Sequence, residues 1–237
     1  MVRRFLIIGV LVFFSMAAFG VDYDGTWFLG FNTTKPPFNK IASRIIAATE
    51  ICKNDPSLPV SFIPPGMDGY DAKLLGGEGR YNIDILPVLP KERKISLLHT
   101  DGEKTIEIAE KIKNSLTKLG FEVELVKLSY KNDEVKWNKA LSSKKYSLFL
   151  MGYKADLESL FTNDPDTADS DTVNLLEPLF KTKGKANFTG YSNKELDKLL
   201  QSAKKAAGEK KITALKKINQ IIYNDIPAMP IFYIEKL

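Results

Sequence analysis

Residues 94–128 read KISLLHTDGEKTIEIAEKIKNSLTKLGFEVELVKL and decide the fold of the chain. The segments Lys94 to His99 and Phe121 to Leu128 each predict a β-strand, because both are short and rich in apolar, partly β-branched residues. Between them, Gly102 to Leu119 repeats apolar residues at helical spacing and stops at Gly120, a residue type that favours the end of a helix. A strand-helix-strand unit this compact implies two parallel strands joined by a right-handed crossover.

Further strands and helices are predicted on both sides of this stretch. The apolar run Tyr146 to Met151 suits a strand that is covered on both faces of a sheet. Further strands are predicted at residues 26–31 and 228–234, and further helices at residues 38–51, 133–141, 173–180, the stretch after Ser192, and a last helix around 212–222. We therefore predict an α/β fold in which a mostly parallel sheet is flanked by helices.

Two helix starts show the pattern of a capping box, in which a hydroxyl residue precedes a Glu by three positions. Thr100 and Glu103 predict such a cap for the helix after the first strand of the unit, and Ser192 and Glu195 predict one for a later helix.

The segment from about Lys53 to Pro90 is rich in proline and glycine, which break long elements. We expect a loop-rich connector there, with at most one short helix near Ala72 to Leu75. The predicted organisation is a signal peptide at residues 1–20 followed by a single domain at residues 21–237.

The first twenty residues predict a secretory signal peptide, since Arg3 and Arg4 precede an uncharged apolar run that ends in small residues. Ala18 and Gly20 fit the −3 and −1 positions of a cleavage site, so the protein is expected to be periplasmic or extracellular. An uncleaved membrane anchor is the alternative, although the run is short for a bilayer crossing.

The composition argues against catalysis, metal binding and nucleic-acid binding. His99 is the only histidine and Cys52 the only cysteine, so zinc sites and most nucleophile-base pairs lack their residues. The net charge is +5, and no basic stripe with interleaved aromatic residues occurs. We predict a protein that is not an enzyme, with no metal, no cofactor and no nucleic-acid partner.

The acidic run Asp164 to Asp171 does not match a calcium-binding loop, because Ala168 and Asp169 stand where an oxygen ligand and a glycine are needed. A solvated acidic loop is the favoured interpretation, and weak calcium binding is the alternative.

Seven short motifs, in order along the chain, resemble the middle and C-terminal part of family 5 (peptide, dipeptide and nickel type) extracellular solute-binding proteins of ABC importers. They are Leu29-Gly-Phe-Asn32 with Lys35-Pro-Pro-Phe38, Phe62-Ile-Pro-Pro-Gly66 with Gly69-Tyr-Asp71, Ser147 to Asp156, Glu177-Pro-Leu-Phe180, Asn187 to Asn193, Asp197 with Leu199-Leu200, and Ile226 to Ile231. The resemblance implies a fold like one lobe of a periplasmic binding protein. It also implies a role in transport by peptide binding, with an ABC permease as a partner.

The resemblance also implies ligand-binding residues. In the family, an aspartate near a Gly-Trp-x-x-Asp segment takes the amine of a bound peptide, and the matching run here is Gly152-Tyr-Lys-Ala-Asp156. Asp156 and Tyr153 are therefore predicted to bind ligand, together with Asn32 from the first motif. A solvated loop carboxylate is the alternative for Asp156.

Two features depart from the family pattern. Tyr153 replaces the usual tryptophan, and the long N-terminal half that forms most of the other lobe does not precede the first motif. Peptide or other solute binding is expected to be weak if this lobe acts alone, so a separate N-terminal lobe is a possible partner. A non-transporting interaction domain, or a gene remnant that kept the fold, is the alternative function. We also expect Trp27, Phe31 and Ile231 to Ile234 to form an exposed apolar patch.

Overall fold

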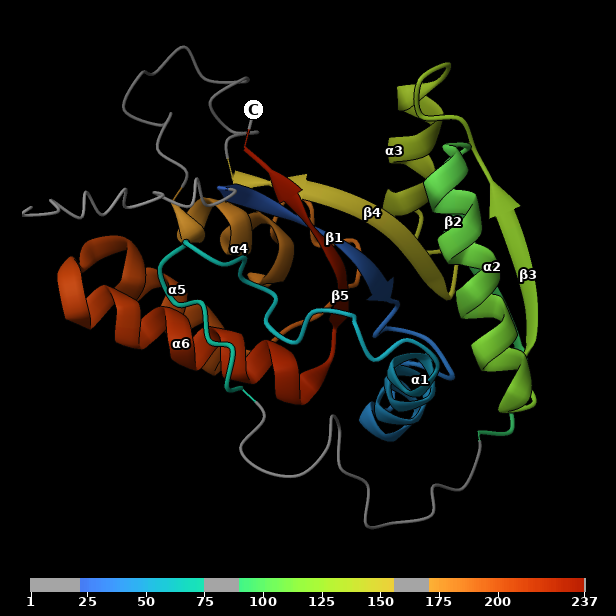
Figure 1. The fold of residues 1–237 in the computed structure, drawn as a ribbon, viewed down its shortest axis with the longest axis horizontal. Helices are drawn as coiled ribbons and strands as arrows, with labels where there is room; N and C mark the ends of the chain where they lie inside the picture. Colours follow the sequence, from blue (N-terminus) through green and yellow to red (C-terminus); the bar gives the residue numbers. More distant parts are fainter. Residues whose placement is uncertain (1–21, 75–89, 156–170, 237) are drawn as a thin grey trace, which may run out of the picture.

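The computed structural model describes residues 22–74, 90–155 and 171–236. Its centre is a five-stranded sheet with the strand order β3-β2-β4-β1-β5 (Figure 1). The strands are β1 (Tyr23–Phe31), β2 (Lys94–His99), β3 (Glu122–Lys127), β4 (Leu148–Lys154) and β5 (Ala228–Glu235). The helices are α1 (Ile41–Asn54), α2 (Glu103–Lys118), α3 (Glu134–Ser142), α4 (Thr172–Phe180), α5 (Lys194–Lys205) and α6 (Gly208–Asp225).

The α/β prediction is confirmed, and the directions of the strands refine it. β2 runs parallel to β3 and to β4, whereas β1 runs antiparallel to both of its neighbours, β4 and β5. The sheet is therefore mixed and not mostly parallel, because the pairs made by β2 are parallel and those made by β1 are antiparallel. The run Trp27-Phe28-Leu29 in β1 is apolar on both faces, as in a parallel strand, so its pattern did not reveal the reversed direction.

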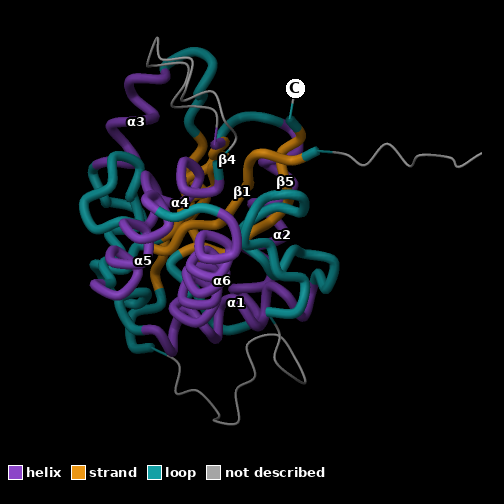
Figure 2. Tube along the Cα trace, turned by 90° about the vertical axis from the view of Figure 1, so that its left-hand side faces the viewer, coloured by secondary structure: helices purple, strands orange, loops and turns teal. Residues whose placement is uncertain are grey.

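Helices cover both faces of the sheet. On one face, α1 and α2 enclose an apolar core that includes Leu29, Leu97 and Leu150. On the other face, α3, α4, α5 and α6 enclose a second core that includes Phe28 and Phe149. The turned view in Figure 2 brings α4, α5 and α6 to the front of the strands.

Helix caps differ from the sequence predictions at both predicted capping boxes. α2 begins after Gly102, which makes no side-chain cap, so Thr100 lies too far upstream to act. The Asn193 side chain caps α5 by accepting from the backbone N–H groups of Glu195 and Leu196 at 2.9 and 3.1 Å. Asn is as good an N-cap as Ser, which explains why the neighbour of Ser192 takes this place.

The C-terminal end of α2 agrees with the prediction at Gly120. This glycine has φ +82°, and its N–H donates to the Thr117 carbonyl. The N–H of Phe121 donates back to the Leu116 carbonyl, which completes the usual glycine-ended helix terminus and turns the chain into β3.

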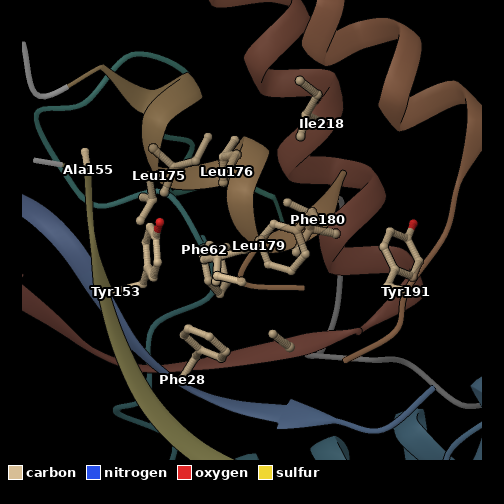
Figure 3. Packing of buried hydrophobic residues seen from close by; sticks show 14 of the residues in the cluster. Phe28, Phe62, Tyr153, Ala155, Leu175, Leu176, Leu179, Phe180, Tyr191 and Ile218 are labelled. Atoms are coloured by element: carbon tan, nitrogen blue, oxygen red, sulfur yellow. The ribbon is translucent and has the colours of Figure 1, made fainter. Parts of the chain in front are cut away.

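The described part of the connector, residues 55–74, contains no helix or strand, and Ala72 to Leu74 are not helical. It is nevertheless fixed in the core. The fully buried Asn219 of α6 accepts from the Phe62 N–H and donates to the Ser61 hydroxyl and the Gly69 carbonyl. Phe62 then packs between Phe28 and Phe180, with ring centroids 5.3 and 4.7 Å away (Figure 3).

The expected apolar patch is not formed as predicted. Phe31 is fully buried and Ile231 is 6% exposed, because both pack against the helices of the α1/α2 face. Trp27 and Phe232 are half-buried and stack on each other.

Candidate functional site

The carboxyl ends of β2 and β4 lie side by side. The connections made by these two strands lie on opposite faces of the sheet. From β2 the chain crosses one face through α2 to reach β3, and from β3 it crosses the other face through α3 to reach β4. In open α/β sheets, a crevice forms outside the carboxyl ends of two such strands, and ligands bind there. The topology therefore places the candidate site beyond His99 and Gly152.

β4 extends past β2 at this end. Leu98 of β2 lies opposite Phe149, so β4 continues through Met151 to Lys154 beyond the last residue of β2. β1 accompanies this extension, with Trp27 opposite Gly152 and Gly25 opposite Lys154. The last residues of β4 are thus held by β1 where they extend beyond the end of β2.

Tyr153 lies on the buried side of this extension. Its side chain is 7% exposed and points toward Leu175 of α4, within the core of the α4–α6 face (Figure 3). Ala155, the last described residue before Asp156, is fully buried in the same core. The structure gives the Tyr153 ring a packing role that fixes β4, and its direct contact with a ligand stays a prediction.

Asp156 lies outside the described residues, so its proposed contact with a ligand also stays a prediction. The residue before it, Ala155, is fully buried and is anchored in the core together with β4.

Asn32 lies at the opposite end of β4. Phe31 pairs with Leu148, five residues before Tyr153, which corresponds to about 17 Å along a strand. The Asn32 amide donates to the carbonyl oxygens of Lys144 and Tyr146, and its oxygen accepts from the N–H and hydroxyl of Thr34. All four hydrogen-bonding positions of this side chain are used within the chain. The structure does not bring Asn32 together with Tyr153, and the contacts assign Asn32 to fixing the turn after β1.

Two features near these strand ends were missed in the sequence. The first is the start of α2, which follows β2 directly and whose N-cap, Gly102, supplies no side chain. Unpaired N–H groups and the helix dipole make such a terminus attractive to anions. His99, 3% exposed, lies beside it in sequence, with Nδ1 2.8 Å from the Thr100 carbonyl oxygen.

The second missed feature is a half-buried aromatic surface on the α1/α2 face, formed by Trp27 and Phe232. Their rings stack with centroids 5.7 Å apart and an interplanar angle of 20°. The ammonium group of Lys104, in the first turn of α2, lies 3.8 Å from the centroid of Phe232. Lys104, which follows β2, thus contacts a residue of β5, although β4 and β1 lie between these two strands in the sheet. Only the strand register reveals this arrangement, because the three residues are far apart in sequence.

No family model matches the chain. It is 27% identical over 244 residues to the dipeptide-binding protein DppE of Bacillus subtilis, an alignment that covers 90% of this chain and 41% of DppE. It is 28% identical over 240 residues to the oligopeptide-binding protein OppA of the same organism, with 88% and 40% covered. The similarity to these two peptide-binding proteins agrees with the family resemblance of the sequence motifs.

Two solved structures share the fold of the chain. The Haemophilus influenzae OppA complex with the peptide RPPGFSPFR has a TM-score of 0.65 and 16% identity, covering 91% of this chain and 44% of that one. HbpA2 from Haemophilus parasuis has a TM-score of 0.70 and 17% identity, with 90% and 43% covered. The chain spans about two fifths of the length of the curated relatives that it matches.

DppE and OppA are named as peptide-binding proteins, in agreement with the prediction that the chain is not an enzyme. Within the described residues, no group of three or more potential metal ligands occurs. A search of the same residues finds no helix with the length and apolarity that a membrane crossing requires.

Proposed function

We propose that this chain forms part of the peptide-binding component of an ABC importer, with the ligand held at the carboxyl ends of β2 and β4. The observation that carries the proposal is the adjacency of β2 and β4, since the connection that leaves β2 and the connection that enters β4 lie on opposite faces of the sheet. The relationship to DppE and OppA of Bacillus subtilis supports a peptide as the ligand.

The charges around the crevice fit a zwitterionic peptide. Asp156, at the end of β4, receives the amino terminus of the peptide, because a carboxylate in a shielded cleft pairs strongly with an ammonium group. The N-terminus of α2 and the ammonium group of Lys104 favour the carboxylate end. Tyr153 and Ala155 anchor the end of β4, which precedes Asp156 in the sequence.

We further propose that the chain is exported through the signal peptide at residues 1–20 and works in the periplasm or at the outer face of the membrane with a permease. A second lobe, as part of the same protein or as a separate chain, would close the crevice, since one wall encloses only part of a ligand. Intact-mass analysis of the exported protein should show a start at Val21. A membrane-retained form with an intact N-terminus would contradict this part of the proposal.

Isothermal titration calorimetry with di-, tri- and oligopeptides tests the binding role, both with the chain alone and with any candidate second lobe added. The substitution Asp156→Asn should weaken the binding of a peptide with a free amino terminus by about ten- to a hundredfold. The reason is that a hydrogen bond to a charged group contributes roughly 1.5–3 kcal/mol. The loss should be absent for a peptide with an acetylated amino terminus. If no peptide binds even with a second lobe present, a non-transporting interaction domain becomes the better interpretation.

A further inference from the structure

Helices α1 and α2 lie next to each other on one face of the sheet (Figure 1), and a cleft of about 300 Å³ lies between the end of α1 and α2. Five aliphatic side chains from α1, the turn after it, α2 and β5 form its floor: Ile51, Leu58, Ile108, Ile112 and Ile231. Lys118, the last residue of α2, lines the cleft and lies about 21 Å along the helix from Lys104. The cleft is therefore separate from the crevice at the carboxyl ends of β2 and β4.

Lys118 places a positive charge on the rim of this cleft. Its ammonium group donates to Asn54 Oδ1 at the end of α1. The Asn54 amide in turn donates to the carbonyl and to the carboxylate of Glu50, at 2.7 and 2.9 Å, which fixes the oxygen that Lys118 contacts. Lys111, on the same rim, is already paired with Glu107 at 2.7 Å. Lys118 makes no ion pair with any described residue, and an ammonium group has three donors, so it can bind an anionic group of a ligand.

Asp55 places a negative charge on the same rim. It follows the last residue of α1, and its Oδ1 accepts from the N–H and the hydroxyl of Ser57 at 3.2 and 2.5 Å. Asp55 forms no ion pair within the part of the chain that the structure describes, so its second oxygen can accept from a ligand. Its charge reaches α2, because Glu107 first and Asp55 after it raise the pKa of Lys111 above its ordinary value.

The combination of an apolar floor and two opposite charges selects among small ligands. Ligand sites are mostly apolar, with a few polar groups that orient the ligand. An aliphatic acid would leave Asp55 without a partner, and an aliphatic amine would leave Lys118 without one, although shielding an unpartnered charge is costly. A zwitterion with an aliphatic side chain satisfies the floor and both charges. At about 30 Å³ for each water-sized group, the cleft holds a ligand of about ten non-hydrogen atoms, which is the size of leucine.

We propose that this cleft is a further binding site, which takes a free amino acid with an aliphatic side chain. The carboxylate of the amino acid binds the Lys118 ammonium group, its own ammonium group binds Asp55, and its side chain packs on the aliphatic floor. The site needs neither the crevice nor a second lobe, since all of its groups belong to α1, the turn after it, α2 and β5. The inference is therefore independent of the proposed function.

NMR titration of the exported protein with L-leucine tests the site. Leucine should shift the amide signals of residues 54–58 and 108–118 in a saturable way. Isocaproic acid, which lacks the ammonium group, and isopentylamine, which lacks the carboxylate, should bind about five- to tenfold more weakly, because each loses one charged contact at a partly exposed rim. Glycine should bind at least about tenfold more weakly, because it leaves the apolar floor uncovered.

Two substitutions assign the charges. Lys118→Met should lower the affinity for leucine about five- to tenfold and leave the affinity for isopentylamine unchanged, because that amine has no carboxylate. Asp55→Asn should lower the affinity for leucine to a similar degree and leave the affinity for isocaproic acid unchanged. The asparagine keeps the acceptor for Ser57, so the turn after α1 is retained.

Lys113→Met and Asp133→Asn are the matched controls, and neither should change leucine binding. Lys113 pairs with Glu110 on α2 and does not line the cleft. Asp133 caps α3 by accepting from the Lys136 N–H, a contact that asparagine can also make.

Three outcomes would overturn the inference. They are the absence of saturable shifts in the cleft up to the solubility limit of leucine, equal affinities for leucine and its two analogues, and shifts confined to the ends of β2 and β4, which would make the crevice the amino-acid site. A failure of every peptide to bind would count against the proposed function alone, since the cleft is tested with leucine and without a second lobe.

Discussion

Trp27 lies directly opposite Gly152 in the ladder between β1 and β4, and its indole crosses β4 where the glycine has no side chain. A Cβ atom at residue 152 would lie 2.8 Å from Trp27 Nε1 and 3.1 Å from Ile234 Cδ1. The same pairing of a glycine with a large side chain occurs at Gly25 with Lys154 and at Gly30 with Phe149. These pairs explain how β1 and β4 stay in register along the ladder that they share.

Gly152→Ala should destabilise the protein by about 1–3 kcal/mol, because the added methyl group forces the Trp27 ring out of its place. Chemical denaturation measures this change. The double variant Gly152→Ala/Trp27→Phe should lose less than the sum of the two single variants, since the phenyl ring lacks the clashing atom. Simple additivity of the two losses would contradict the proposed packing.

Tyr191 donates its hydroxyl hydrogen to the Asp225 carboxylate, which also accepts from Asn193 at 3.1 Å. The backbone carbonyl of Asp225 in turn accepts two hydrogen bonds from Arg44, at 2.9 and 2.7 Å. These contacts join α1, the end of α6 and the start of α5. Tyr191→Phe should therefore cost roughly 1.5–3 kcal/mol of stability, the usual contribution of a hydrogen bond to a charged group.

The same side chain predicts a pH dependence. Burial, and then the bond to Asp225, raises the pKa of Tyr191 above its ordinary value of 10.0. Above pH 10 the unfolded chain loses this proton while the folded chain keeps it, so the contribution is present below pH 10 and decreases as the pH rises beyond it. The wild type should lose stability more steeply than Tyr191→Phe between pH 9 and 11, roughly around the ordinary tyrosine pKa. Parallel curves for the two proteins would contradict the prediction.

Asn219→Ala should release the connector from α6. The substitution leaves the Phe62 N–H, the Ser61 hydroxyl and the Gly69 carbonyl without a buried partner side chain, at a cost of about 2–4 kcal/mol. Limited proteolysis should then cut between residues 59 and 70, where the wild type resists. Gln220→Ala is the control, because its side chain makes an exposed bond to Asn224. Equal resistance in both variants would show that apolar packing of Phe62 is enough.

The sequence predicted features that local interactions determine and missed features that depend on residues distant in the sequence. β2 was predicted with the bounds that the structure shows, and Gly120 was identified as the end of α2, because both signals are local. The direction of β1 and the pairs Trp27–Gly152 and Asp24–Lys154 depend on strands that are distant in sequence. The place of Asn32 also depends on distant contacts: its side chain bonds within a turn far from Tyr153, and its contact with a ligand stays a prediction.

Lys104 provides a direct test of the carboxylate end of the proposed site. Its ammonium group stands at the start of α2, whose N-terminus carries no side-chain cap, and is held 3.8 Å above the Phe232 ring. Lys104→Met should weaken a peptide with a free carboxyl terminus by roughly five- to tenfold, because the charge-assisted contact is lost. A peptide with an amidated carboxyl terminus should bind the variant and the wild type equally. Lys113→Met serves as the control, since Lys113 lies about two and a half turns further along α2 and pairs with Glu110 at 3.9 Å. If Lys104→Met lowers the affinity for both peptides to the same degree, the lysine supports the aromatic surface and does not contact the ligand carboxylate, and the carboxyl terminus must be bound elsewhere.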